Sequence, residues 1–89
     1  MDGKYYLDKL MKMPAEFNIL YQEKRYAQAK RVYDTAVQVA LFLEVPEETK
    51  IQLFGSKQDE NNIVNGLFNE YMVQKCYYEV SVKRQASGQ

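Results

Sequence analysis

Between Lys24 and Glu44, apolar side chains recur at three- and four-residue steps, and no glycine or proline interrupts them. This period is typical of an amphipathic α-helix, in which residues three and four apart share one face. Residues 36–43 are apolar on nearly every side, which is typical of a helix covered by more than one neighbour. The valines there leave a buried strand as the rival interpretation, but the unbroken period from Tyr26 favours a long central helix over residues 24–44.

Proline and glycine divide the rest of the chain into further helical segments. Pro14 and Pro46 suit the first turn of a helix, where the missing proline N–H has no partner to lose, and Gly55 suits the position just after a helix end. The predicted helices span residues 3–12, 14–22, 46–54 and 61–83. We expect residues 55–62 to form a polar connector and residues 85–89 to form a flexible tail.

The last predicted helix carries two neighbouring rows of apolar residues. The first row is Ile63, Leu67, Tyr71, Tyr78 and Val82, and the row beside it is Val64, Phe68, Met72 and Cys76. The sequence therefore predicts an all-α fold, a compact bundle of four to five helices within a single domain over residues 1–84. Its two long helices, residues 24–44 and 61–83, are expected to pack antiparallel.

Composition limits how this domain can be stabilised. With 89 residues, one cysteine and no histidine, the chain has no disulfide framework and no Cys/His cluster, so its core must come from apolar packing or from a partner chain. Equal numbers of acidic and basic residues, twelve of each, argue against a protein whose main work is neutralising phosphates. The sequence shows no export signal and no apolar run of the roughly 18 residues typical of a membrane span, so we expect a cytoplasmic protein.

Residues 14–44 resemble a single tetratricopeptide-like helical hairpin, in which alanines allow two helices to approach and aromatics fill the flanking gaps. The residues that carry this resemblance are Tyr21, Tyr26, Ala29, Tyr33 and Ala36. Arg25 replaces the small residue of the turn, the closing proline is missing, and there is one copy where stacked repeats need about three. The resemblance implies a helical hairpin of similar local design. The whole chain also resembles short uncharacterised helical proteins of Gram-positive phages and conjugative elements. This second resemblance assigns no functional residue.

Residues that could carry chemistry are few. Cys76 has no histidine to act as its base and sits in an apolar row, which favours a buried structural thiol. The acidic pairs at 47–48 and 59–60 lie at expected helix starts, where carboxylates stabilise the positive helix end. Residues 59–62 lack the glycine and glutamate spacing of a calcium loop. We therefore expect no enzyme, no cofactor and no metal site.

Two groups of residues are candidate binding surfaces. The pairs Tyr5–Tyr6 and Tyr77–Tyr78 cannot each point both rings into one core, and tyrosine is enriched in interface hot spots, although amphipathic residues rimming the core remain the alternative. A candidate nucleic-acid surface, predicted to converge with Lys83 or Arg84 on one face, consists of Lys24, Arg25, Lys30 and Arg31. Acidic residues at 23 and 34 interrupt this basic group, so an ordinary solvated helix face is its alternative.

The leading hypothesis is a non-enzymatic interaction module that binds itself, as a homodimer, or another protein through tyrosine-rich helical surfaces. The alternative is a nucleic-acid-binding accessory protein of a mobile genetic element.

Overall fold

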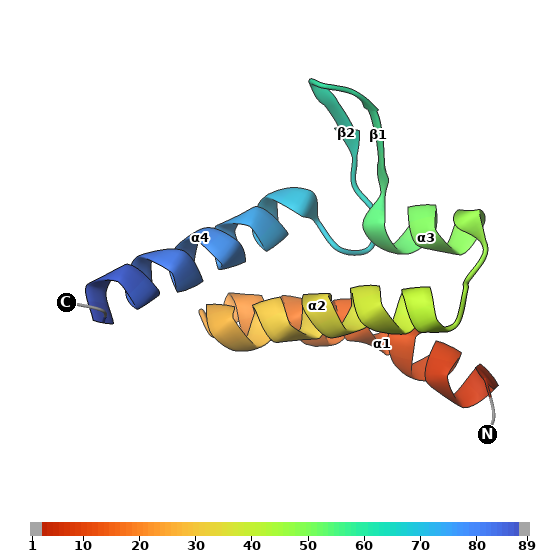
Figure 1. Ribbon diagram of the computed structural model, residues 1–89, viewed down its shortest axis with the longest axis horizontal. Coiled ribbons are helices and arrows are strands. Elements are labelled where there is room, and N and C mark those ends of the chain that lie inside the picture. Colours follow the sequence, from red (N-terminus) through yellow and green to blue (C-terminus); the bar gives the residue numbers. More distant parts are fainter. Residues whose placement is uncertain (1–2, 88–89) are drawn as a thin grey trace.

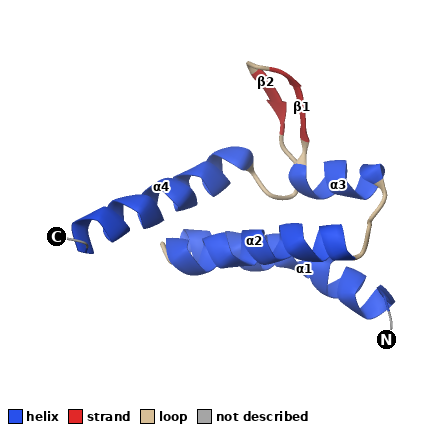
Figure 2. Ribbon diagram, viewed as in Figure 1, coloured by secondary structure: helices blue, strands red, loops and turns tan. Residues whose placement is uncertain are grey.

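The computed structural model describes residues 3–87, which form four helices and one two-stranded antiparallel hairpin (Figures 1 and 2). In chain order the elements are α1 (Gly3–Gln22), α2 (Tyr26–Phe42), α3 (Glu47–Phe54), β1 (Ser56–Asp59), β2 (Asn62–Val64) and α4 (Glu70–Ser87). The mainly helical fold expected from the sequence is confirmed. A purely helical bundle is not, because the hairpin β1–β2 projects from the body of the molecule.

Helix α1 joins two helices that the sequence had predicted as separate, residues 3–12 and 14–22. Pro14 lies inside it, and it removes one helical hydrogen bond because proline has no N–H. The helix continues because Leu10, Pro14 and Phe17 lie on one face and are all buried. Figure 1 shows the N-terminal turns running at an angle to the rest of α1, as a proline inside a helix predicts.

Helices α1 and α2 form a hairpin whose turn is closed by backbone hydrogen bonds. The N–H of Lys24 donates to the carbonyl of Tyr21 at 2.9 Å, and the N–H of Arg25 donates to that of Leu20 at 2.9 Å. This pair of bonds is a Schellman motif, and Lys24 takes the left-handed conformation at φ 62°. The helix predicted over residues 24–44 is confirmed, but it is two residues shorter at each end and spans Tyr26–Phe42.

The core combines small residues with one aromatic side chain from each of four segments. Helix α2 buries Ala29, Ala36 and Ala40, which keep its packing face narrow. The aromatic cluster consists of Phe17 of α1, Tyr33 of α2, Phe54 of α3 and Phe68 of the segment before α4. Phe68 is its centre, since its ring centroid lies 5.5, 5.2 and 5.7 Å from those of Phe17, Tyr33 and Phe54.

The prediction of helix over residues 61–69 is wrong, because local side-chain and glycine geometry there favours a hairpin and a loop. At the hairpin tip the N–H of Asn61 donates to Oδ1 of Asp59 at 2.9 Å, a side-chain turn that competes with helix. Gly55 has φ 77°, and a Cβ on it would lie 1.9 Å from the Val64 carbonyl oxygen. A Cβ on Gly66 would lie 2.5 Å from the backbone of Leu53, so both glycines are required where the hairpin closes.

Helix α4 begins at Glu70 because Asn69 caps it. The Oδ1 atom of Asn69 accepts from the N–H groups of Tyr71 at 2.9 Å and Met72 at 3.3 Å. Helices α2 and α4 run in opposite directions, as expected, although α4 spans residues 70–87 and not 61–83 (Figure 1). The helix thus extends three residues into the expected tail of residues 85–89, of which 88 and 89 lie outside the described residues.

Candidate interaction surface

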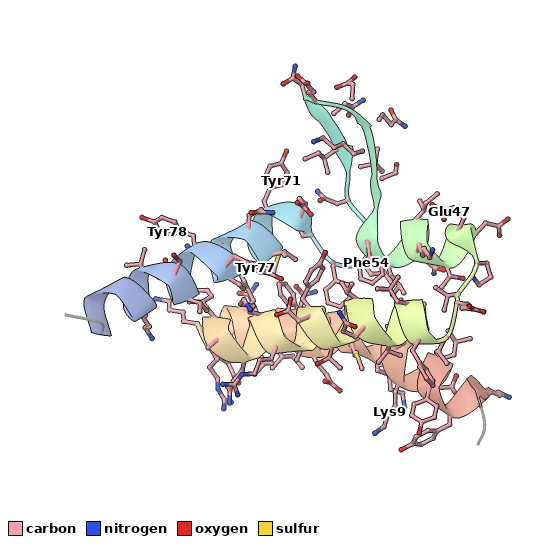
Figure 3. The ribbon with its side chains drawn as sticks, viewed as in Figure 1. Lys9, Glu47, Phe54, Tyr71, Tyr77 and Tyr78 are labelled. Atoms are coloured by element: carbon pink, nitrogen blue, oxygen red, sulfur yellow. The ribbon has the colours of Figure 1, made fainter. Side chains whose placement is uncertain are left out.

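Helix α4 divides its residues between the core and the solvent. Val73 and Cys76 are buried, whereas Tyr71, Tyr78 and Val82 are 66%, 67% and 41% exposed. At about 100° per residue, the three exposed positions lie within roughly 20° of one direction, which is opposite the core side. Figure 3 shows Tyr71 and Tyr78 on the side of α4 that faces away from α2. We call this surface the outer face of α4; it consists of Tyr71, Gln74, Lys75, Tyr78 and Val82.

Of the two apolar rows predicted for the last helix, it is mainly the second that is buried. Phe68 and Cys76 of that row enter the core, and Met72 packs against it. The exposed members of the first row are Leu67, Tyr71, Tyr78 and Val82. The sequence therefore contained the apolar residues of the outer face, but periodicity alone did not indicate which row would face solvent.

A polar cluster joins α2 and α4 along their seam. The hydroxyl of Tyr77 donates to Oδ1 of Asp34, and the ammonium of Lys30 donates to Oδ2 of the same carboxylate at 2.8 Å. The Lys30 ammonium also lies 4.8 Å from the centroid of the Tyr77 ring, within cation–π range. Because Tyr77 points toward α2, its neighbour Tyr78 must point away from it, and Figure 3 shows this difference.

The cluster keeps a single protonation state at neutral pH. Burial raises the pKa of Tyr77 to about 12, and the hydrogen bond to the Asp34 carboxylate adds to the rise. Burial alone would raise the pKa of Asp34, but the hydrogen bonds from Lys30 and Tyr77 outweigh it and hold that pKa below 3.8. Tyr77 is therefore a neutral donor and Asp34 a charged acceptor across the whole physiological range.

The four tyrosines predicted as one partner surface lie apart. Tyr5 and Tyr6 form an edge-to-face pair near the N-terminus of α1, with ring centroids 5.3 Å apart. Tyr78 lies on α4 toward the opposite end of the long axis of the molecule (Figures 1 and 3). Tyr77 belongs to the seam with α2. Of the four, Tyr78 alone contributes to the outer face of α4, and Tyr71, which the sequence hypothesis omitted from the surface, is its second tyrosine.

The four predicted basic residues are also divided between different surroundings. Lys24 is exposed in the α1–α2 turn, and Arg25 pairs with Glu23 at 3.4 Å. Lys30 lies on the seam with α4, whereas Arg31 lines a hollow of about 160 Å³ with residues of α1. Lys30 and Arg31 thus lie on different sides of α2. Lys83 lies beside Tyr26 and Glu79, and the side chain of residue 84 is outside the described part of the chain.

Two larger hollows flank α3. One of about 260 Å³ lies at the base of the hairpin and is lined by Phe54, Gly55, Ser56, Lys57, Ile63 and Glu70. The other, of about 250 Å³, lies between α2 and α3 and is lined by Tyr33, Val37, Ala40, Leu41, Lys50 and Phe54. The first brings together one amine and one carboxylate, and the second has a single charged group, Lys50, at its edge.

The thiol of Cys76 is fully buried, and burial raises its pKa, which disfavours the reactive thiolate. Among residues 3–87, no three side chains of the metal-binding types Asp, Glu and Cys come together. Within the same residues, no helix is both long enough and apolar enough to cross a lipid bilayer.

Neither a protein-family model, nor a curated protein, nor a solved structure matches the chain.

Proposed function

We propose that the protein is a small, non-enzymatic helical interaction module that associates with itself through the outer face of α4. The observation that carries the proposal is the position of Tyr71 and Tyr78. Both rings are about two-thirds exposed, and both stand on the face of α4 opposite its buried side. A single exposed tyrosine is ordinary in a small protein, but two on one helical face, followed by Val82, form a continuous amphipathic strip.

The strip suits a protein partner because covering it costs little. A tyrosine has two side-chain torsions, so fixing it in an interface loses little conformational entropy. Its ring supplies apolar area and its hydroxyl can still bond at the rim. Tyrosine is accordingly among the residues that contribute most to binding energy at interfaces.

The polar residues between the two tyrosines already have partners within the chain. The amide of Gln74 donates to Glu70 at 3.1 Å, and the ammonium of Lys75 lies 5.8 Å from the ring centroid of Tyr26 on α2. Lys75 thus lies on the outer face of α4 with its ammonium directed toward the edge nearest α2. The formal net charge of zero also means that two copies do not repel one another at long range.

The test is the mass of the protein in solution, measured by sedimentation velocity over a range of concentrations. We expect the unmodified chain to approach twice its mass of 10.5 kDa as concentration rises. The double variant Tyr71→Ser/Tyr78→Ser is expected to stay at the monomer mass. Both should show the same helical circular dichroism, because the substituted rings lie outside the core.

The matched control is Tyr5→Ser, since Tyr5 is a 54% exposed tyrosine on α1, away from the strip. It should associate as the unmodified chain does, at low and at high salt, because apolar contacts are not screened. A monomer at every concentration, or a double variant that associates normally, would contradict the proposal.

A further inference from the structure

We propose that the hollow at the base of the hairpin binds a free α-amino acid with an apolar side chain. The ammonium of Lys57 meets the carboxylate of this ligand, and the carboxylate of Glu70 meets its ammonium. The inference goes beyond self-association, since the hollow and the outer face of α4 consist of different residues. The hollow has a volume of about 260 Å³. Pockets for drug-sized ligands begin at about 300 Å³, so this one suits a smaller molecule.

The two charged groups of the hollow have opposite signs and are not paired with each other. Lys57 comes from β1 and Glu70 from the first turn of α4, and neither forms an ion pair with any residue that the structure describes. Within the same residues, the Glu70 carboxylate accepts only from the amide of Gln74, at 3.1 Å. Each charge can therefore still bind a group of the opposite sign. An α-amino acid carries both of the required groups on one carbon and can meet the two charges at once.

The rest of the lining supplies apolar walls for the side chain of the ligand. Phe54 at the end of α3 and Ile63 of β2 are both half-buried. The Phe54 ring is stacked on that of Phe68, with centroids 5.7 Å apart, so the core holds this wall in position. Apolar surface that the ligand buries against these two residues strengthens binding in proportion to its area.

The frame of the hollow is fixed by contacts within the chain. The hairpin rises where α3 ends and the segment before α4 returns (Figure 1). Gly55 and Gly66 lie so close together there that neither has room for a Cβ. The N–H of Glu70 donates to Oδ1 of Asn65 at 2.8 Å, which joins the first residue of α4 to the loop after β2. A preformed site loses little free energy to ordering when a ligand binds.

Leucine is the probe, and ¹H–¹⁵N correlation spectra of the unmodified chain, recorded at one fixed protein concentration, follow its binding. We expect leucine to shift the amide signals of Gly55, Ser56, Lys57 and Ile63, with saturation at millimolar ligand. Leucinamide lacks the carboxylate and isocaproate lacks the ammonium. Each should bind about fivefold more weakly or worse, which corresponds to the loss of one exposed ion pair.

Two substitutions test the same charges from the side of the protein. Lys57→Met and Glu70→Gln each remove one charge and nearly preserve side-chain length, and each should weaken leucine binding about fivefold or more. The control Lys50→Met removes an equivalent charge from the hollow between α2 and α3 and should leave leucine binding unchanged. Amide signals far from the hollow show whether each variant is folded, and the ligand series needs no variant at all.

Three results would overturn the inference: no leucine-dependent shifts around the hollow, equal binding of leucine, leucinamide and isocaproate, or equal weakening by Lys50→Met and Lys57→Met. None of them depends on whether the chain is a monomer or a dimer, so the proposed self-association stands or falls separately.

Discussion

The residue on which the packing of the four helices depends most is Phe68. Its side chain is 1% exposed, and its ring meets one aromatic ring from each of α1, α2 and α3 at centroid distances between 5.2 and 5.7 Å. The backbone on either side is fixed as well, since the N–H of Phe68 donates to the carbonyl of Leu53 at 2.9 Å. Replacing it with alanine removes the centre of the cluster without affecting any cap or turn.

The expected loss is large for a chain of this size. Deleting a buried phenylalanine ring costs about 3–5 kcal/mol through lost transfer energy and the cavity left behind. A domain of 89 residues has a free energy of unfolding of about 4–13 kcal/mol. Phe68→Ala should therefore remove about a quarter or more of the stability. The control, Phe42→Ala, deletes the same ring at a site that is 78% exposed and should change stability by less than about 0.5 kcal/mol.

Urea unfolding followed by far-ultraviolet circular dichroism measures both losses. Protein concentration is held constant, because self-association would add to the apparent stability. The midpoint for Phe68→Ala should fall sharply with little change in the slope of the transition. Equal effects of the two substitutions would refute the assignment of Phe68 to the centre of the core.

Three further substitutions or reagents test other parts of the structure. Tyr77→Phe should lower the free energy of unfolding by about 0.5–1.5 kcal/mol, since its partner is partly solvated. The pKa of Asp34 is lowered on folding and that of Tyr77 is raised to about 12, so the stability lost in Tyr77→Phe should shrink as the pH falls below 3.8 or rises above 10.0. A loss of unfolding free energy that stays constant down to pH 2 would contradict the hydrogen bond. Gly66→Ala should destabilise the fold by at least about 2 kcal/mol in urea titrations, because its Cβ would overlap the backbone of Leu53. The control Gly3→Ala should not destabilise it, because no atom lies within 4 Å of the added Cβ. Equal effects of the two substitutions would contradict the close approach at Gly66. The thiol of Cys76 should react with Ellman's reagent only at the rate at which the fold opens, and immediate reaction in the native state would contradict its burial.

Much of the helical structure could be predicted from periodicity and from helix-end signals. The period between Tyr26 and Leu43 located α2, and Pro46 and Gly55 marked both ends of α3. These signals are local, so they survive in a single sequence. Pro14 was misread for the same reason: proline is compatible with a helix start and with a helix interior, and burial of the Leu10–Phe17 face decides between them.

The segment after α3 could not be predicted because its structure depends on contacts with distant backbone. Ile63 and Val64 fit a helical period with Leu67, yet they belong to a strand whose closure requires two glycines at close approach. The orientation of the side chains on the candidate surface could not be predicted for the same reason. The sequence indicated that Tyr77 and Tyr78 could not both point into one core, but it did not indicate that Tyr77 would be the one to hydrogen-bond to Asp34 on α2.

The central claim is that association takes place on the outer face of α4. Its most direct test is a dilution series of ¹H–¹⁵N correlation spectra of the unmodified chain. We predict that concentration shifts the amide signals of Tyr71, Gln74, Tyr78 and Val82, while the hollow between α2 and α3 is unaffected. Shifts confined instead to Leu41, or spectra that do not change up to millimolar concentration, would contradict the claim.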